Sequence, residues 1–365
     1  MFWRTGSRSR GACPWSSPIS RIAPLCSAIL GCSGAAPTAY ARHFAAGERA
    51  ETAGRHAEAA SAFESASRDK ASPRERAHAS FLAALEQIRA GDVSGGAARL
   101  EAIGKTRGEH AAEARWQLVS LDLATKNPAA TKELDDLLRA FPNEGVAYPA
   151  LHARLRIARD AGGEAEALSV LRALEPAVAG TDSAPRVAYE IAESLAKLGK
   201  TAEARDAFVE VARKFPYPGE YFDDALYRAS ELDQELGKNE GAVADLDRML
   251  SVMESSTLPG TYIRPRFPDA AWRIAVLERD ALHDDAKAIA AFERYVDLFP
   301  NDIRRAEALW NAGKLRGDHA CDDWSRIVSI APDSRYVPCV AERCKDVSIP
   351  KKSEAPKTCH AYITR

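Results

Sequence analysis

The stretch DAKAIAAFERYVDLFPND, residues 285–302, combines a helical apolar pattern with an abrupt proline stop. Its small residue Ala288 is followed four positions later by Phe292, three further on by Tyr295 and five further on by Pro300. This spacing places the apolar side chains on one face of a helix, and the proline prevents the helix from continuing. The same order of residues recurs in GKTAEARDAFVEVARKFP, residues 199–216. The stretch is therefore one copy of a repeated unit.

Eight copies of this unit follow one another. Their small residues lie at positions 59, 96, 130, 167, 204, 242, 288 and 320, so the successive intervals are 37, 34, 37, 37, 38, 46 and 32 residues. A helix-turn-helix unit with a period near 34 resembles the tetratricopeptide repeat. The resemblance covers residues 40–332. It implies an all-α fold, an α-solenoid of about eight units.

The fifth copy shows why such units must stack. Ala188, Ile191 and Leu195 recur at helical spacing, Gly199 permits a turn, and a second apolar series around Phe208 follows. Each helix is apolar along one stripe, so it has to pack both on its partner and on the next pair. One unit cannot bury both faces alone, and a continuous array is expected.

Breaks in the pattern divide the chain into segments. The 46-residue interval contains a proline-rich insertion, which is either a tolerated surface loop or a loop that contacts a partner. We expect an export signal (1–31), a linker (32–41), units one to six (42–254), the insertion (255–268), units seven and eight (269–333) and a cysteine-containing tail (334–365).

The N-terminus has the composition of an export signal. Basic residues precede a short apolar run at 22–30, and no acidic residue appears before Glu48. The run is too short to span a bilayer. The sequence ILGC at 29–32 resembles a bacterial lipobox with Cys32 as the lipidated residue, whereas AYA at 39–41 fits ordinary cleavage after Ala41. A chance apolar N-terminus, in a cytoplasmic adaptor, is the third interpretation.

The C-terminal tail region contains four of the chain's seven cysteines. Cys321, Cys339, Cys344 and Cys359 form an even set in the last 45 residues, as suits an oxidising compartment. We expect disulfides, and we favour pairing Cys321 with Cys339 and Cys344 with Cys359 because each closes a local loop. A zinc site or redox-active thiols are the alternatives.

The inner helices of the array contain the candidate binding site. In tetratricopeptide arrays, positions 2, 5, 9 and 12 of the first helix of each unit face the ligand. Transferring these positions selects basic and aromatic residues, namely Arg115, His152, Arg156, Arg159, Arg186, Tyr189, Tyr227 and Arg273. Such a groove suits an acidic peptide or a C-terminal carboxylate, through charge-assisted hydrogen bonds from arginine. The alternative interpretation is an ordinary solvated helix face.

Several function classes are disfavoured by the sequence. The 50 Lys and Arg balance 52 Asp and Glu, whereas a non-specific nucleic-acid binder has a basic excess. The two GKT tripeptides, at 104–106 and 199–201, lack the earlier glycine of a phosphate-binding loop. We therefore expect no catalysis, no cofactor and no metal.

The helix endings RAFPN, RKFPY and DLFPND, at 139–143, 213–217 and 297–302, are similar to those of the β-barrel assembly lipoprotein and of the periplasmic cell-division coordinator family. This resemblance implies an outer-membrane lipoprotein that faces the periplasm and scaffolds envelope assembly or maintenance. Its partners would be other proteins or peptides, and a lipid would provide its membrane attachment. A soluble periplasmic or secreted protein is the alternative localisation. An envelope redox or enzyme-associated factor with active C-terminal cysteines is the alternative function.

Overall fold

The computed structural model describes residues 38–253 and 266–363. These residues form helices and turns, with no strand among them. The α-helices are α1 (Ala39–Thr52), α2 (His56–Arg68), α3 (Pro73–Arg89), α4 (Val93–Gly104), α5 (Ala111–Ala124), α6 (Ala129–Ala140), α7 (Ala147–Val178), α8 (Ala184–Lys197), α9 (Thr201–Lys214), α10 (Phe222–Glu235), α11 (Asn239–Ser251), α12 (Arg266–Asp280), α13 (Asp285–Leu298), α14 (Arg305–Arg316), α15 (Ala320–Ile330) and α16 (Val337–Arg343).

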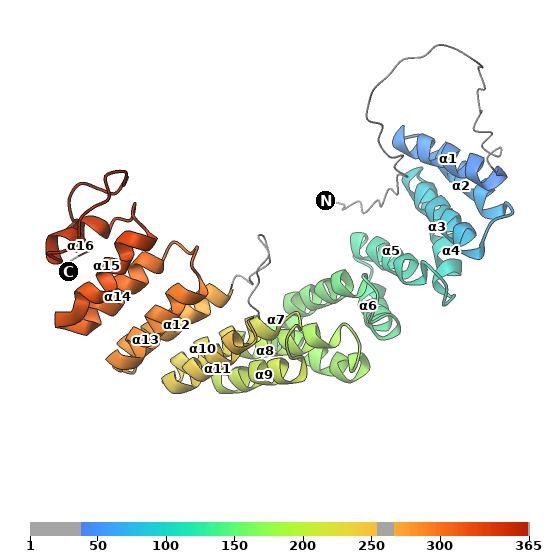
Figure 1. The fold of residues 1–365 in the computed structure, drawn as a ribbon. Coiled ribbons are helices and arrows are strands. Elements are labelled where there is room, and N and C mark those ends of the chain that lie inside the picture. Colours follow the sequence, from blue (N-terminus) through green and yellow to red (C-terminus); the bar gives the residue numbers. More distant parts are fainter. Residues whose placement is uncertain (1–37, 254–265, 364–365) are drawn as a thin grey trace, which may run out of the picture.

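Consecutive helices pack in antiparallel pairs along an extended, curved array (Figure 1). Helix α7 is itself one such pair, because Gly162 and Gly163 have non-helical backbone angles and Gly163 has a φ of 68°. That left-handed conformation is open to glycine and reverses the chain. With α7 counted as two helices, the pairs from α1–α2 to α14–α15 give the eight expected units. The expected all-α solenoid is confirmed.

The repeated small residues lie where helices approach most closely. All eight are buried, and Ala59, Ala204 and Ala288 are completely inaccessible. The aromatic residue four positions later is also completely buried in three units, as Phe63, Phe208 and Phe292. A larger side chain at a small position would push neighbouring helices apart. The spacing seen in the sequence therefore comes from interhelical packing.

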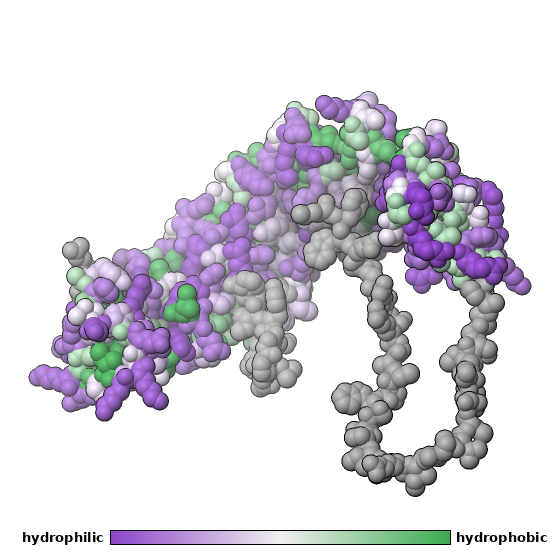
Figure 2. Space-filling view, turned by 90° about the horizontal axis from the view of Figure 1, so that it is seen from above, coloured by the Kyte–Doolittle hydropathy of each residue, from purple (hydrophilic) through white to green (hydrophobic). Residues whose placement is uncertain are grey.

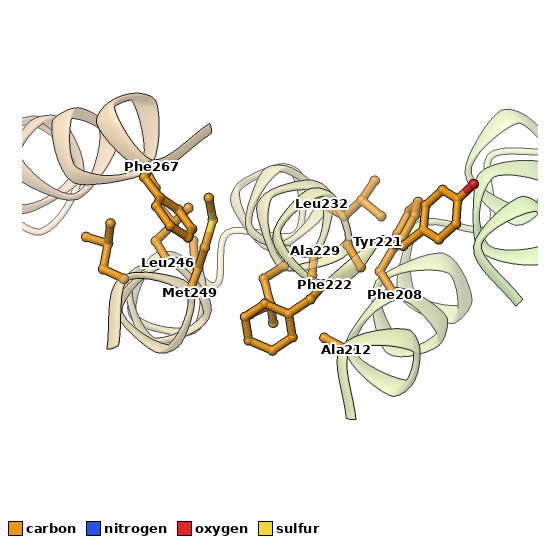
Figure 3. Close-up of a cluster of buried hydrophobic side chains, with 14 of the residues drawn as sticks. Phe208, Ala212, Tyr221, Phe222, Ala229, Leu232, Leu246, Met249 and Phe267 are labelled. Atoms are coloured by element: carbon orange, nitrogen blue, oxygen red, sulfur yellow. The ribbon is translucent and has the colours of Figure 1, made fainter. Parts of the chain in front are cut away.

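From Val119 of unit three to the tail, one hydrophobic core runs from unit to unit, whereas the buried residues before it form two smaller clusters. Figure 3 shows this for units five to seven: Phe208 of α9, Phe222 and Leu232 of α10, Met249 of α11 and Phe267 of α12 contribute to one cluster. Each of these side chains is less than 5% exposed. No unit buries its own apolar faces, so each unit is stabilised by packing against its neighbours.

Two expected boundaries differ from those observed. Helix α1 begins at Ala39, because the Thr38 side chain accepts a hydrogen bond from the Ala41 amide and caps it. The linker therefore ends before 41, and the alternative cleavage point lies within the first turn of α1. Helix α12 begins at Arg266, so 266–268 are helical and the rest of the insertion, with Tyr262 and Arg264, lies outside the described residues. The export signal and Cys32 lie outside them as well.

The tail closes the end of the array by a pairing that corrects our expectation. The disulfides join Cys321 to Cys344 and Cys339 to Cys359. The expected local loops do not form, because residues 337–343 are helix α16. At about 100° per residue, Cys339 and Cys344 leave this helix in different directions. Cys344 therefore meets α15, and Cys339 meets the last residues of the tail.

Candidate functional site

The candidate residues lie on the first helices of units three to seven. Figure 1 shows α8, α10 and α12 on the inner side of the array's curve, with α9, α11 and α13 outside them. Figure 2 shows that polar residues dominate the face seen there, with separate apolar areas between them. Seven of the candidates fall into three groups, and Arg115 lies apart from them.

The first group is a ladder of arginine and aromatic rings across units four to six. The Arg186 guanidinium lies 4.0 Å from the centre of the Tyr148 ring and 5.3 Å from that of Tyr221. Tyr189 packs against Tyr221, at 4.8 Å between ring centres, and against the buried Phe208. Burial raises the pKa of the Tyr189 hydroxyl, so this hydroxyl stays protonated. The ladder is a rigid, partly apolar surface with one cation in it.

Beside this ladder is a surface hollow of about 740 Å³ between α5 and α7. Its apolar wall comes from Trp116 and Leu123 of α5 and from Tyr148, Pro149 and Ala153 of α7. Its polar residues include three of the candidates, His152, Arg156 and Arg159. An aromatic wall with a few polar groups is the usual composition of a binding site.

The two arginines of this hollow differ in whether an acidic side chain of the protein already pairs with them. Arg159 donates to Glu164 at 3.0 Å and to Glu190 at 3.4 Å, so its charge is already compensated. Arg156 is exposed and makes no ion pair or hydrogen bond with any described residue. Arg156 is therefore the cation in the hollow that is free to meet a negatively charged group.

The remaining candidates lie elsewhere. The Tyr227 ring is flanked by Arg266 at 4.8 Å and Arg273 at 5.2 Å, and Arg273 donates to Glu231 at 3.0 Å. Arg115 faces away from this surface, because its Nε donates to the Gly104 carbonyl at 2.7 Å and its guanidinium covers the Phe141 ring. The structure therefore places Arg115 apart from the other candidates, in a hollow lined by Glu101 and Leu118.

Sequence reasoning missed two kinds of residue. The first kind is aromatic, because Trp116, Tyr148 and Tyr221 supply the aromatic surfaces. Tyr148 is the second residue of α7, so position 2 counted from the observed start of this helix selects it. The second kind is the acidic partner. Glu190 comes from the next unit, and the one-dimensional pattern gave no signal of its ion pair with Arg159.

The C-terminal cysteines form disulfides and not a metal site. The described residues contain no cluster of three or more His, Cys, Asp or Glu placed to hold a metal ion. In residues 38–253 and 266–363, no helix is both long enough and apolar enough to cross a bilayer.

Comparison with known proteins identifies the repeat. Residues 186–216 and 269–302 match the family model of the tetratricopeptide repeat, and these ranges are units five and seven. Units five and seven are thus tetratricopeptide repeats, and the other helix pairs of the described residues continue the same solenoid. Such arrays present extended surfaces that bind other proteins, and this one is a protein-interaction scaffold of that class. No curated relative matches the chain.

Solved structures with similarity to the chain include tetratricopeptide-repeat proteins. The MamA RS-1 ArsTM double mutant is 20% identical, with a TM-score of 0.33, over 54% of this chain and 96% of its own. The C-terminal part of a TPR repeat-containing protein from Cytophaga hutchinsonii is 15% identical, with a TM-score of 0.41, over 73% and 99%. A tetratricopeptide repeat protein from Parabacteroides merdae is 14% identical, with a TM-score of 0.30, over 75% and 98%.

Proposed function

We propose that the protein is a non-catalytic scaffold of the bacterial cell envelope, and that the hollow between α5 and α7 binds an acidic or C-terminal segment of another envelope protein. The observation that carries this proposal is the exposed, unpaired Arg156 beside the aromatic wall of Trp116 and Tyr148. A carboxylate on the ligand would accept from Arg156, while an apolar side chain next to it would pack on the rings.

The proposed location rests on two features of the chain. The basic and apolar N-terminus ends in ILGC at 29–32, which would make Cys32 the lipidated residue of an outer-membrane lipoprotein facing the periplasm. The paired cysteines of the tail also suit an oxidising compartment. Mass spectrometry of the mature protein tests the location: a diacylglyceryl group on Cys32 is expected, and an intact N-terminus would overturn export.

Crosslinking in intact cells, followed by identification of the crosslinked protein, tests the binding function. The variant Arg156→Glu should then weaken binding of the purified partner about 10- to 100-fold, because a charge-assisted hydrogen bond contributes about 1.5–3 kcal/mol. Arg172→Glu is the matched control, since Arg172 is also exposed on α7 and has no partner among the described residues. Equal binding by both variants would refute the role of the hollow.

The double variant Arg156→Glu with Arg186→Glu extends this test to the ladder. Arg186 stacks on two rings and lies 3.6 Å from Glu220, so its reversal also disturbs local packing. Circular dichroism should show unchanged helicity before the binding result is interpreted. Full binding by the folded double variant would exclude the whole surface from Tyr148 to Tyr221.

A further inference from the structure

Helix α5 is apolar on two opposite faces. Trp116 and Leu123 face the hollow described above, whereas Leu118 and Leu121 lie on the other side, as the rotation of about 100° per residue requires. All four side chains are only half-buried. A helix that is apolar all round is normally enclosed by neighbours. In this array, α5 instead has a hollow on each side.

The second hollow, of about 580 Å³, lies between α4, α5 and α6. One wall is a single face of α4, because Val93, Ala97, Glu101 and Lys105 are spaced by four residues and all line it. At 1.5 Å per residue this wall is about 18 Å long. Leu118, Val119 and Leu121 of α5 also line the hollow, and Val93 is 48% exposed. A segment of about three helical turns matches this length.

The charges around this hollow are predominantly negative. Four carboxylates line it, from Glu101, Asp122, Glu133 and Asp136. The two cations are engaged, since Lys105 lies 3.6 Å from Glu101, and Arg115 is bonded to the Gly104 carbonyl.

Two of these carboxylates have no cationic partner. Asp122 accepts from the Asn127 amide at 2.7 Å, but neither Asp122 nor Glu133 forms an ion pair with a described residue. Burial is the main cause that raises the pKa of the Glu133 carboxyl, and the neighbouring carboxyl of Asp122 raises it further. Lys132 opposes this rise, but its ammonium pairs with Asp136 at 2.6 Å, so no described cation forms an ion pair with Asp122 or Glu133.

We propose that the hollow between α4, α5 and α6 docks a basic amphipathic helix from a partner protein. The apolar face of that helix packs on Val93, Ala97, Leu118 and Leu121, and a lysine or arginine at its flank pairs with Asp122 and Glu133. Charge complementarity selects this occupant, because an acidic helix would bring further carboxylates against an uncompensated pair. This surface is on the opposite side of α5 from the hollow with Arg156, and the two proposals stand independently.

A synthetic helix of Leu and Lys, about 14 residues long and bearing a photo-crosslinker, tests the inference on the full mature chain. Asp122→Asn with Glu133→Gln should weaken its binding at least tenfold, measured by fluorescence anisotropy. Glu175→Gln with Glu235→Gln is the control, since it removes the same charge from exposed positions in units four and six and should leave binding unchanged. Crosslinks should fall within residues 93–136, and a matched Leu and Glu helix should not bind.

Several outcomes would overturn the inference. Equal weakening in the control would mean that net charge alone attracts the peptide, and crosslinks outside 93–136 would place it elsewhere. If the free chain has twice its monomer mass by light scattering, and Val93→Asp restores the monomer, a second copy occupies the hollow. Val93→Asp should also weaken peptide binding to a monomeric chain, and it acts at an exposed position where folding is little affected.

Discussion

Asp245 is the best place to test the energetics of this array, because two acidic side chains there share one arginine. The Arg205 guanidinium on α9 lies 2.9 Å from Asp233 of α10 and 3.4 Å from Asp245 of α11. Asp233 is fully buried, and its second carboxylate oxygen has no hydrogen-bond partner among the described residues. Burial, reinforced by the charge of Asp233 and opposed by Arg205 and Arg248, raises the pKa of Asp245 to about 6.

This pKa fixes the direction of a pH effect on stability. The folded state holds the Asp245 proton up to about pH 6, whereas the unfolded chain releases it near the ordinary value of 3.8. The folded state therefore binds more protons in this window, and stability from this group falls as pH rises through it. The pKa of Asp245 rises from 3.8 to about 6 on folding. At about 1.36 kcal/mol per pKa unit, this shift contributes at most about 3 kcal/mol to the free energy of unfolding. Asp245→Asn removes the titration, so its stability relative to wild type should rise by about 2–3 kcal/mol from pH 3.5 to pH 7.5.

Urea unfolding of both proteins at each pH measures this difference, and hydrogen exchange in α9–α11 localises it. Comparing variant with wild type at the same pH cancels the titration of groups that do not interact with Asp245. Asp206→Asn is the control, because Asp206 contacts the same Arg205 but its side chain is 77% exposed. A difference between Asp245→Asn and wild type that stays constant with pH would refute a buried, protonated Asp245.

Three further perturbations test the packing. Phe208→Ala empties a site that is 0% exposed and should lower the free energy of unfolding by about 3–5 kcal/mol, measured by urea unfolding. Gly313→Ala places a methyl group 2.3 Å from Nε1 of Trp324, and this overpacking should cost about 1–3 kcal/mol in the same assay. Cys339→Ser with Cys359→Ser opens a link between residues separated by 20 positions and should cost about 3 kcal/mol, seen as a lower melting temperature.

The fold was predictable because packing constraints repeat along the chain. Ala204 and Phe208 are buried for the same reason as Ala288 and Phe292, and each copy in the sequence strengthens the interpretation of the others. Turns without glycine were harder to find. His283, between α12 and α13, has a φ of 54°, in the left-handed region that residues other than glycine rarely adopt. Nothing in the local sequence marks this position as a turn.

The binding surface was only partly predictable, because its charge state depends on contacts between units. Helix position alone selected Arg156 and Arg159, and both line the hollow between α5 and α7. Their availability depends on Glu164 and Glu190, and Glu190 lies 31 residues from Arg159 in sequence. The cysteine pairing failed for a similar reason. We predicted the pairing from loop length, whereas the directions in which side chains leave helix α16 decide which sulfur atoms meet.

The packing around α5 supports both proposed binding sites, because two hollows border this helix. An apolar side chain that becomes fully buried stabilises a complex by roughly 25 cal/mol for each Å² removed from water. Most large apolar side chains of this array are already buried within the fold, so a partner gains little from them. Trp116, Leu118, Leu121 and Leu123 retain exposed area, and they border the two hollows. The free, cationic Arg156 on one side and the unpaired carboxyls of Asp122 and Glu133 on the other then give the two faces opposite charge preferences. A single helix would thereby bind two chemically distinct partners, and mutation of either face should leave binding at the other unchanged.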